Sequence, residues 1–81
     1  MKKINLEKII LIIAKKIGVD GKEININSKS TDFYRWDSLT QVTIILDIEK
    51  IINKKIIASQ IGELNSVKKI IDYLKKNKVF L

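Results

Sequence analysis

The chain has 81 residues, of which 46% are hydrophobic, and this suits one compact domain near the lower size limit for a self-sufficient core. It contains neither cysteine nor histidine, which excludes disulfides, thiolate nucleophiles, imidazole-based metal sites and catalytic triads built on imidazole. The longest apolar run, residues 9–14, is too short to span a bilayer, and no signal-peptide cleavage site follows the basic N-terminus. We therefore expect a cytoplasmic protein without stable membrane insertion.

The formal net charge of +7 raises nucleic acid or an anionic membrane as partners, but the charge distribution argues against them. Residues 1–17 carry five lysines against one acid, and residues 58–81 carry five against two, whereas residues 18–57 are balanced. Only one of the 16 basic residues is arginine, the side chain favoured for bidentate phosphate and base contacts. We expect no nucleic-acid partner, and keep a basic helical module that binds nucleic acid or an anionic membrane as the alternative.

The first predicted element is a helix over about residues 4–17. Its apolar residues recur at three- and four-residue steps, as on one helical face: Leu6, Ile9, Ile10, Ile13 and Ile17. Asn5 is a candidate N-cap, and Gly18 ends the helix.

A long ordered loop is predicted over residues 18–37. It is rich in Asp, Asn, Ser and Thr, and its apolar anchors are scattered. The alternation over residues 24–27 is compatible with a short strand, but no other segment offers it a partner, so it is interpreted as loop. Trp36 is expected to anchor the loop to the bundle because it buries a large area.

A second helix is predicted over about residues 38–53, with Asp37 as its N-cap. It has too many apolar residues for one core stripe, so part of it must be covered or available to a partner. A short third helix over about 59–64 and a last helix over about 66–77, capped by Ser66, complete a single domain spanning residues 1–81.

The sequence Trp36-Asp37-Ser38-Leu39, where the loop meets the second helix, resembles the acyl carrier protein family of the stand-alone type. The resemblance extends from about Ile4 to Leu74. It includes the second-helix positions Val42, Ile48, Glu49, Ile52 and Ile56, and the ending Ser66-Val67 with Ile71-Asp72-Tyr73-Leu74. It implies an all-α, acyl-carrier-like four-helix bundle with three longer helices, a short third helix and a long loop between the first two.

In that family a phosphopantetheinyl transferase joins the motif serine, here Ser38, to a 4'-phosphopantetheine arm taken covalently from coenzyme A. The resemblance implies that Asp37 helps the transferase hold its metal ion and orient the hydroxyl. An anionic phosphodiester on Ser38 would meet the unsatisfied N–H groups and positive dipole end of a helix. No base lies near Ser38 in the sequence, so we expect modification in trans, no catalytic residue, no metal site of its own, and a carrier rather than an enzyme. The plain structural interpretation is that Asp37 and Ser38 act only as an N-cap and its neighbour.

The resemblance also implies roles for two apolar groups. Leu39, Val42 and Leu46 form one line beside Ser38, for which core packing is the plain structural interpretation. The resemblance implies instead that they are partly exposed and dock partner enzymes, whereas Ile44, Ile45, Ile48 and Ile52 fill the core. If the cargo is a fatty chain, the expected acyl pocket lies between the second, third and fourth helices, near Ile56, Ile61, Leu64 and Ile71.

Two differences between this sequence and the usual family pattern bear on the biosynthetic pathway that the carrier serves. Fatty-acid carriers usually have small residues where Trp36 stands, and a tryptophan looks more like stand-alone carriers of other pathways. Lys50, Lys54 and Lys55 lie among the acids of a region that is usually acidic, which weakens acid-to-base steering. We expect a monomer that presents an acyl thioester from a loading ligase to acyl-accepting enzymes of lipid, fatty acid, polyketide or related biosynthesis. An aminoacyl or peptidyl carrier, such as a D-alanyl carrier protein, is the alternative.

Overall fold

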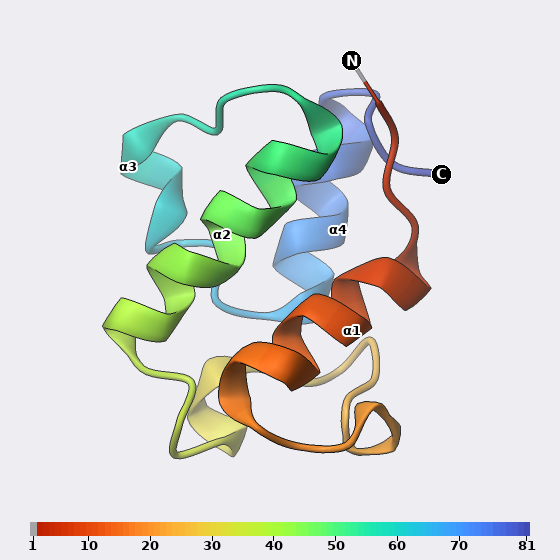
Figure 1. Cartoon of the computed structure of the whole chain (residues 1–81). Helices are drawn as coiled ribbons and strands as arrows, with labels where there is room; N and C mark the ends of the chain where they lie inside the picture. Colours follow the sequence, from red (N-terminus) through yellow and green to blue (C-terminus); the bar gives the residue numbers. More distant parts are fainter. Residues whose placement is uncertain (1) are drawn as a thin grey trace.

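The computed structural model describes residues 2–81, which form four α-helices joined by loops (Figure 1). The helices are α1 Leu6–Ile17, α2 Ser38–Ile52, α3 Ala58–Ile61 and α4 Val67–Lys76, and two 3-10 turns lie in the first loop, at Gly21–Glu23 and Ser30–Asp32. Three longer helices, one short third helix and a long first loop confirm the predicted all-α bundle.

The helix ends follow from local side-chain chemistry. The Lys8 backbone N–H donates to Asn5 Oδ1 at 2.9 Å, and the Lys69 N–H donates to Ser66 Oγ at 3.1 Å, so both predicted N-caps are present. Gly18 adopts a left-handed conformation with φ of 73° and ends α1. These residues set the direction in which each loop leaves its helix.

The N-terminal segment differs from the predicted start of the first helix at residue 4. Ile4 is extended and pairs with the C-terminal tail: its N–H donates to the Val79 carbonyl at 2.9 Å, and the Leu81 N–H donates to the Ile4 carbonyl at 2.9 Å. The two ends of the chain therefore lie side by side (Figure 1). This pairing buries Ile4 and Val79 and takes Ile4 out of the helix.

Helix α3 ends earlier than the predicted 59–64. It stops at Ile61, and the N–H groups of Glu63 and Leu64 both donate to the Gln60 carbonyl, at 3.0 and 3.1 Å, in a turn. A helix of four residues does not persist by itself in water. Contacts with the rest of the bundle must therefore hold α3 in place.

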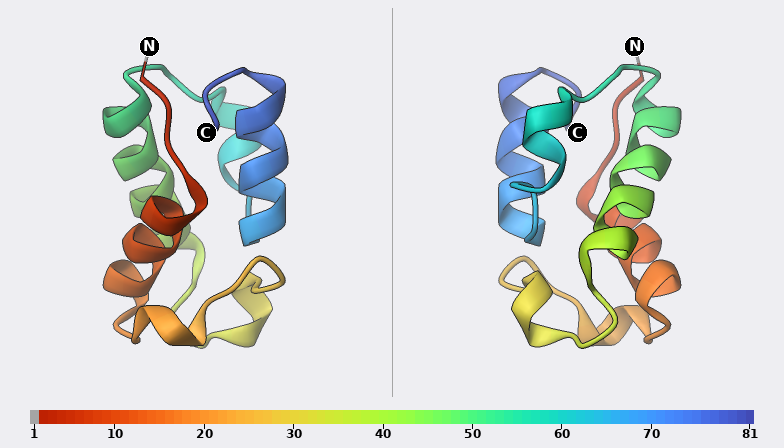
Figure 2. Two further views of the ribbon diagram at one scale, coloured as in Figure 1. Left: turned by 90° about the vertical axis from the view of Figure 1, so that its right-hand side faces the viewer. Right: turned by 90° about the vertical axis from the view of Figure 1, so that its left-hand side faces the viewer.

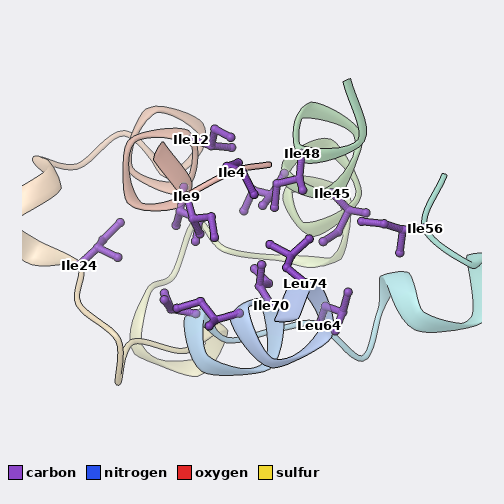
Figure 3. Close-up of a cluster of buried hydrophobic side chains, with 14 of the residues drawn as sticks. Ile4, Ile9, Ile12, Ile24, Ile45, Ile48, Ile56, Leu64, Ile70 and Leu74 are labelled. Carbon is purple, nitrogen blue, oxygen red and sulfur yellow. The ribbon is translucent and has the colours of Figure 1, made fainter. Parts of the chain in front are cut away.

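The core lies between α1, α2 and α4 and consists almost entirely of isoleucine, leucine and valine (Figure 3). Figure 3 shows Ile9 of α1, Ile48 of α2 and Leu74 of α4 in the same interior. The four α2 side chains predicted to fill the core are all buried: Ile44, Ile45, Ile48 and Ile52.

The loop between α1 and α2 is ordered, as predicted, and closes one end of the bundle (Figure 2). Its backbone pairs with the α3–α4 connection: the Ser30 N–H donates to the Asn65 carbonyl at 2.9 Å, and the Val67 N–H donates to the Ser28 carbonyl at 3.0 Å. Residues 24–27 form no strand. The loop delivers Trp36, buried as predicted, to the start of α2.

Candidate functional site

The first turn of α2 carries the two residues singled out by the motif. Ser38 is the first residue of the helix and its side chain is exposed. Asp37 is the N-cap, and its Oδ1 accepts a hydrogen bond from the Thr40 backbone N–H at 2.9 Å. The predicted cap is therefore confirmed, and the serine hydroxyl faces solvent at the positive end of a 15-residue helix.

Asp37 is held ionised by this arrangement. The hydrogen bonds from the backbone and side chain of Thr40 lower the pKa of the Asp37 carboxyl below its ordinary value of 3.8. Because Asp37 is exposed, its negative charge is presented to solvent beside the Ser38 hydroxyl. A carboxylate in this position can help an approaching enzyme hold a cation.

Two hollows flank the start of α2. One, of about 410 Å³, lies toward α3 and contains Ser38 itself; it is lined by Ser30, Trp36, Asp37, Ser38, Gln41, Val42, Ile61, Gly62 and Asn65. The other, of about 630 Å³, lies toward the end of α1 and is lined by Lys15, Lys16, Gly18, Tyr34, Arg35, Asp37 and Thr40. The Ser38 side chain thus lines the first hollow. The second hollow is rich in cationic side chains and shares Asp37 with the first.

The predicted docking line is exposed along α2. Leu39, Val42 and Leu46 retain 75%, 39% and 44% of their accessible surface, which is high for apolar residues of a helix in a bundle. Their predicted exposure is confirmed. These three side chains form an apolar strip on α2 that begins next to Ser38 and leads away from its exposed hydroxyl.

The predicted acyl-pocket residues are mostly buried, and only Ile61 lines the hollow that contains Ser38. Ile56, Leu64 and Ile71 are buried, and Ile61 is half-buried and packs against the core. Figure 3 shows Ile56 and Leu64 on the α3 side of the interior. In this structure their side chains belong to the hydrophobic core.

Sequence reasoning missed Gln41, which is the buried polar residue of α2, with 4% of its surface exposed. Its Oε1 accepts from Trp36 Nε1 at 2.7 Å, and its Nε2 donates to the carbonyls of Ile61 at 2.8 Å and Leu64 at 2.6 Å. A signal was present, because Gln41 precedes Ile44, Ile45 and Ile48 on the core-facing side of the helix. We call Gln41 with these three partners the Gln41 network.

Comparison with known proteins agrees with the geometry. The sequence model of the family described as "Phosphopantetheine attachment site" matches residues 7–74, which include the start of α2. The chain belongs to the acyl carrier protein family. It is 35% identical over 71 residues to an acyl carrier protein of Syntrophobacter fumaroxidans, covering 88% of each chain. It is 30% identical over 71 residues to an acyl carrier protein of Porphyromonas gingivalis, covering 88% of this chain and 91% of the relative.

As an acyl carrier protein, the chain is a carrier rather than an enzyme, and its cofactor is covalently bound 4'-phosphopantetheine. When bound, this group supplies a terminal thiol that holds an acyl group as a thioester. Family membership favours this function over the basic helical module. Within residues 2–81, no helix combines the length and the apolarity needed to cross a membrane.

Proposed function

We propose that Ser38 is the attachment point of the phosphopantetheine arm and that a phosphopantetheinyl transferase modifies it. The observation that carries this proposal is an exposed hydroxyl at the first residue of α2, beside an ionised N-cap carboxylate. Two other serines are less suitable: Ser28 is buried and its Oγ accepts from Asn25 N–H, and the Oγ of Ser66 is used as a cap.

The transfer joins the Ser38 hydroxyl to the phosphate of the arm, and the acyl carrier protein activates neither group by itself. The Ser38 oxygen forms a phosphodiester bond with the arm, the pyrophosphate bond of coenzyme A breaks, and its adenosine bisphosphate part leaves. The hydroxyl proton passes to a base of the transferase, because residues around Ser38 supply no imidazole or amine at hydrogen-bonding distance within the described chain. Asp37 would hold the metal ion of the transferase and orient the hydroxyl.

The phosphodiester formed on Ser38 would be favourably placed at the start of α2. A phosphodiester on Ser38 places a negative charge at the end of α2 where the first N–H groups lack helical partners. We expect the modified protein to be at least as stable as the unmodified one, since an anion at this end complements the helix dipole.

The apolar strip Leu39, Val42 and Leu46 is the proposed contact for the transferase, for an acyl- or aminoacyl-loading ligase and for acyl-accepting enzymes. Acidic steering contributes little, because Asp47 on the same helix is paired with Lys16 at 3.1 Å. Apolar area near the attachment point is then the main source of affinity. The pathway remains biosynthesis of lipids, polyketides or related products, and a monomeric, cytoplasmic state remains a prediction from the sequence.

Intact-mass measurement tests the attachment site. Incubation with coenzyme A, magnesium and a broad-specificity transferase should add one arm to the wild type and none to Ser38→Ala. Ser59→Ala is the matched control, because Ser59 is also exposed on a helix and should not affect the reaction. Failure of several transferases to modify the wild type, or an arm on Ser38→Ala, would contradict the proposal.

A further inference from the structure

The Gln41 network joins three separate parts of the chain at the side of the hollow that faces the core. One side-chain amide binds the indole of the loop residue Trp36 and the carbonyls of Ile61 and Leu64, the last residue of α3 and the connection after it. Both amide hydrogens and the amide oxygen are therefore used. The last carbonyls of a short helix lack helical partners, and here Gln41 of α2 donates to that of Ile61, the final residue of α3.

The network includes two of the four predicted acyl-pocket residues, Ile61 and Leu64. Trp36, Gln41 and Ile61 line the hollow that contains Ser38, whereas Ile56, Leu64 and Ile71 are buried and do not line it. A long chain that entered from the hollow would have to move Ile61 and Leu64 away from α2. That movement would leave the two amide hydrogens of Gln41 and the carbonyls of Ile61 and Leu64 without partners in buried or partly buried surroundings, which is strongly unfavourable.

We infer that the Gln41 network keeps the interior closed, so that this carrier holds a short acyl group with hydrogen-bonding substituents outside its core. This inference rests on the proposed attachment at Ser38. It deepens the function by naming the class of cargo, such as a short hydroxyacyl or aminoacyl group. It also argues against use of the predicted acyl pocket.

The hollow itself has the chemistry that such a cargo requires. Its lining combines the hydroxyl of Ser30 and the amide of Asn65 with the apolar surfaces of Val42 and Ile61, in about 410 Å³. Hydrogen-bonding groups at the rim can pair with a hydroxyl or amino substituent, and the apolar walls can cover a few carbon atoms. A long alkyl chain would leave most of its length in water.

A series of cargo lengths tests this inference on the whole protein. Acetyl, 3-hydroxybutyryl and decanoyl arms are attached to Ser38 from the matching coenzyme A thioesters, and loading is verified by intact mass. Trp36 is the single tryptophan, so its indole N–H gives one NMR signal that reports directly on the bond to Gln41. We expect the same indole shift, the same slow hydrogen exchange and the same Tm for the unloaded form and for all three loaded forms. A decanoyl form with a shifted indole signal and a raised Tm would overturn the inference.

A variant pair tests the part played by Gln41. In Gln41→Ala the network is lost, and we expect Tm to rise with cargo length from acetyl to decanoyl, because the pocket can then open. Gln60→Ala is the matched control: Gln60 lies on α3 outside the network and should behave as the wild type.

A Gln41→Ala protein that folds but shows no dependence on length would also overturn the inference. If Gln41→Ala does not fold, Trp36→Phe replaces it as the variant, because it removes the indole donor alone. The series of loaded wild-type proteins tests the closed interior in either case. Failure of the attachment itself would be visible earlier and separately, as the absence of any added mass.

Discussion

Replacing Gln41 with leucine isolates the stabilising effect of the buried amide from its volume. The two side chains are similar in size, so Gln41→Leu leaves little cavity but removes every hydrogen bond of the Gln41 network. The indole N–H of Trp36 and the carbonyl of Leu64 lose their partner in buried surroundings, and the Ile61 carbonyl loses its partner in partly buried ones.

The expected loss follows from these three groups. A buried polar group left without a partner costs about 1–3 kcal/mol, and the more apolar leucine side chain offsets part of the total. We expect the free energy of unfolding to fall by about 3 kcal/mol, against about 4–12 kcal/mol available to a domain of this length. At about 4–8 °C for each kcal/mol, Tm should fall by roughly 12–24 °C.

Urea and thermal unfolding followed by far-UV circular dichroism measure this loss, with Gln60→Leu as the control, expected within about 0.5 kcal/mol of the wild type. A double-mutant cycle adds a second check. Trp36→Phe should cost about 1 kcal/mol less in the Gln41→Leu background than in the wild type, because its hydrogen bond is already absent. A Gln41→Leu protein within about 0.5 kcal/mol of the wild type, with an unchanged m value, would refute the reasoning.

Other predictions concern the helix ends and the exposed strip. Gly18→Ala should lower the free energy of unfolding by at least about 1 kcal/mol, because φ is 73° and Arg35 Nη1 lies 2.6 Å from the added Cβ. In Gly62→Ala, which has φ of −73° and no atom within 4 Å of the new Cβ, stability should stay equal or rise by up to about 1 kcal/mol. Equal losses in urea unfolding would contradict this pair. Because the folded-state pKa of Asp37 is lowered, its contribution is complete above its ordinary value of 3.8 and disappears as pH falls through the folded-state pKa. Asp37→Asn keeps a capping oxygen and should flatten this part of the stability–pH curve, and it should slow modification by the transferase. An Asn variant with the same acid dependence would be inconsistent with that role. Leu46→Ser should reduce kcat/KM of the transferase about tenfold at nearly unchanged Tm, as for a leucine buried against a partner. Leu11→Ser, at a 53% exposed position of α1, should leave kcat/KM unchanged. Equal effects of the two serine substitutions would exclude a docking role for the strip.

The longer helices were predictable because their signals are local. Periodic isoleucines predict the buried face of α1, and Asn5, Asp37 and Ser66 satisfy N–H groups only three residues away. The motif at the start of α2 was equally visible, since an N-cap followed by serine needs no knowledge of the rest of the fold. The exposure of Leu39, Val42 and Leu46 was implied by the family resemblance, because their spacing on the helix is equally compatible with core packing.

The pairing of Ile4 with the C-terminal tail, the early end of α3 and the Gln41 network were decided by tertiary structure. Each depends on backbone or side-chain groups that come together only after the helices pack. Gln41 and Leu64 are 23 positions apart, and a polar residue among isoleucines does not indicate which carbonyl it will meet. The sequence by itself determined where the longer helices and the motif serine, Ser38, lie. Only the packing of the chain decided that a buried amide closes the route from that serine to the core, because an unsatisfied hydrogen bond has a cost only once water is excluded.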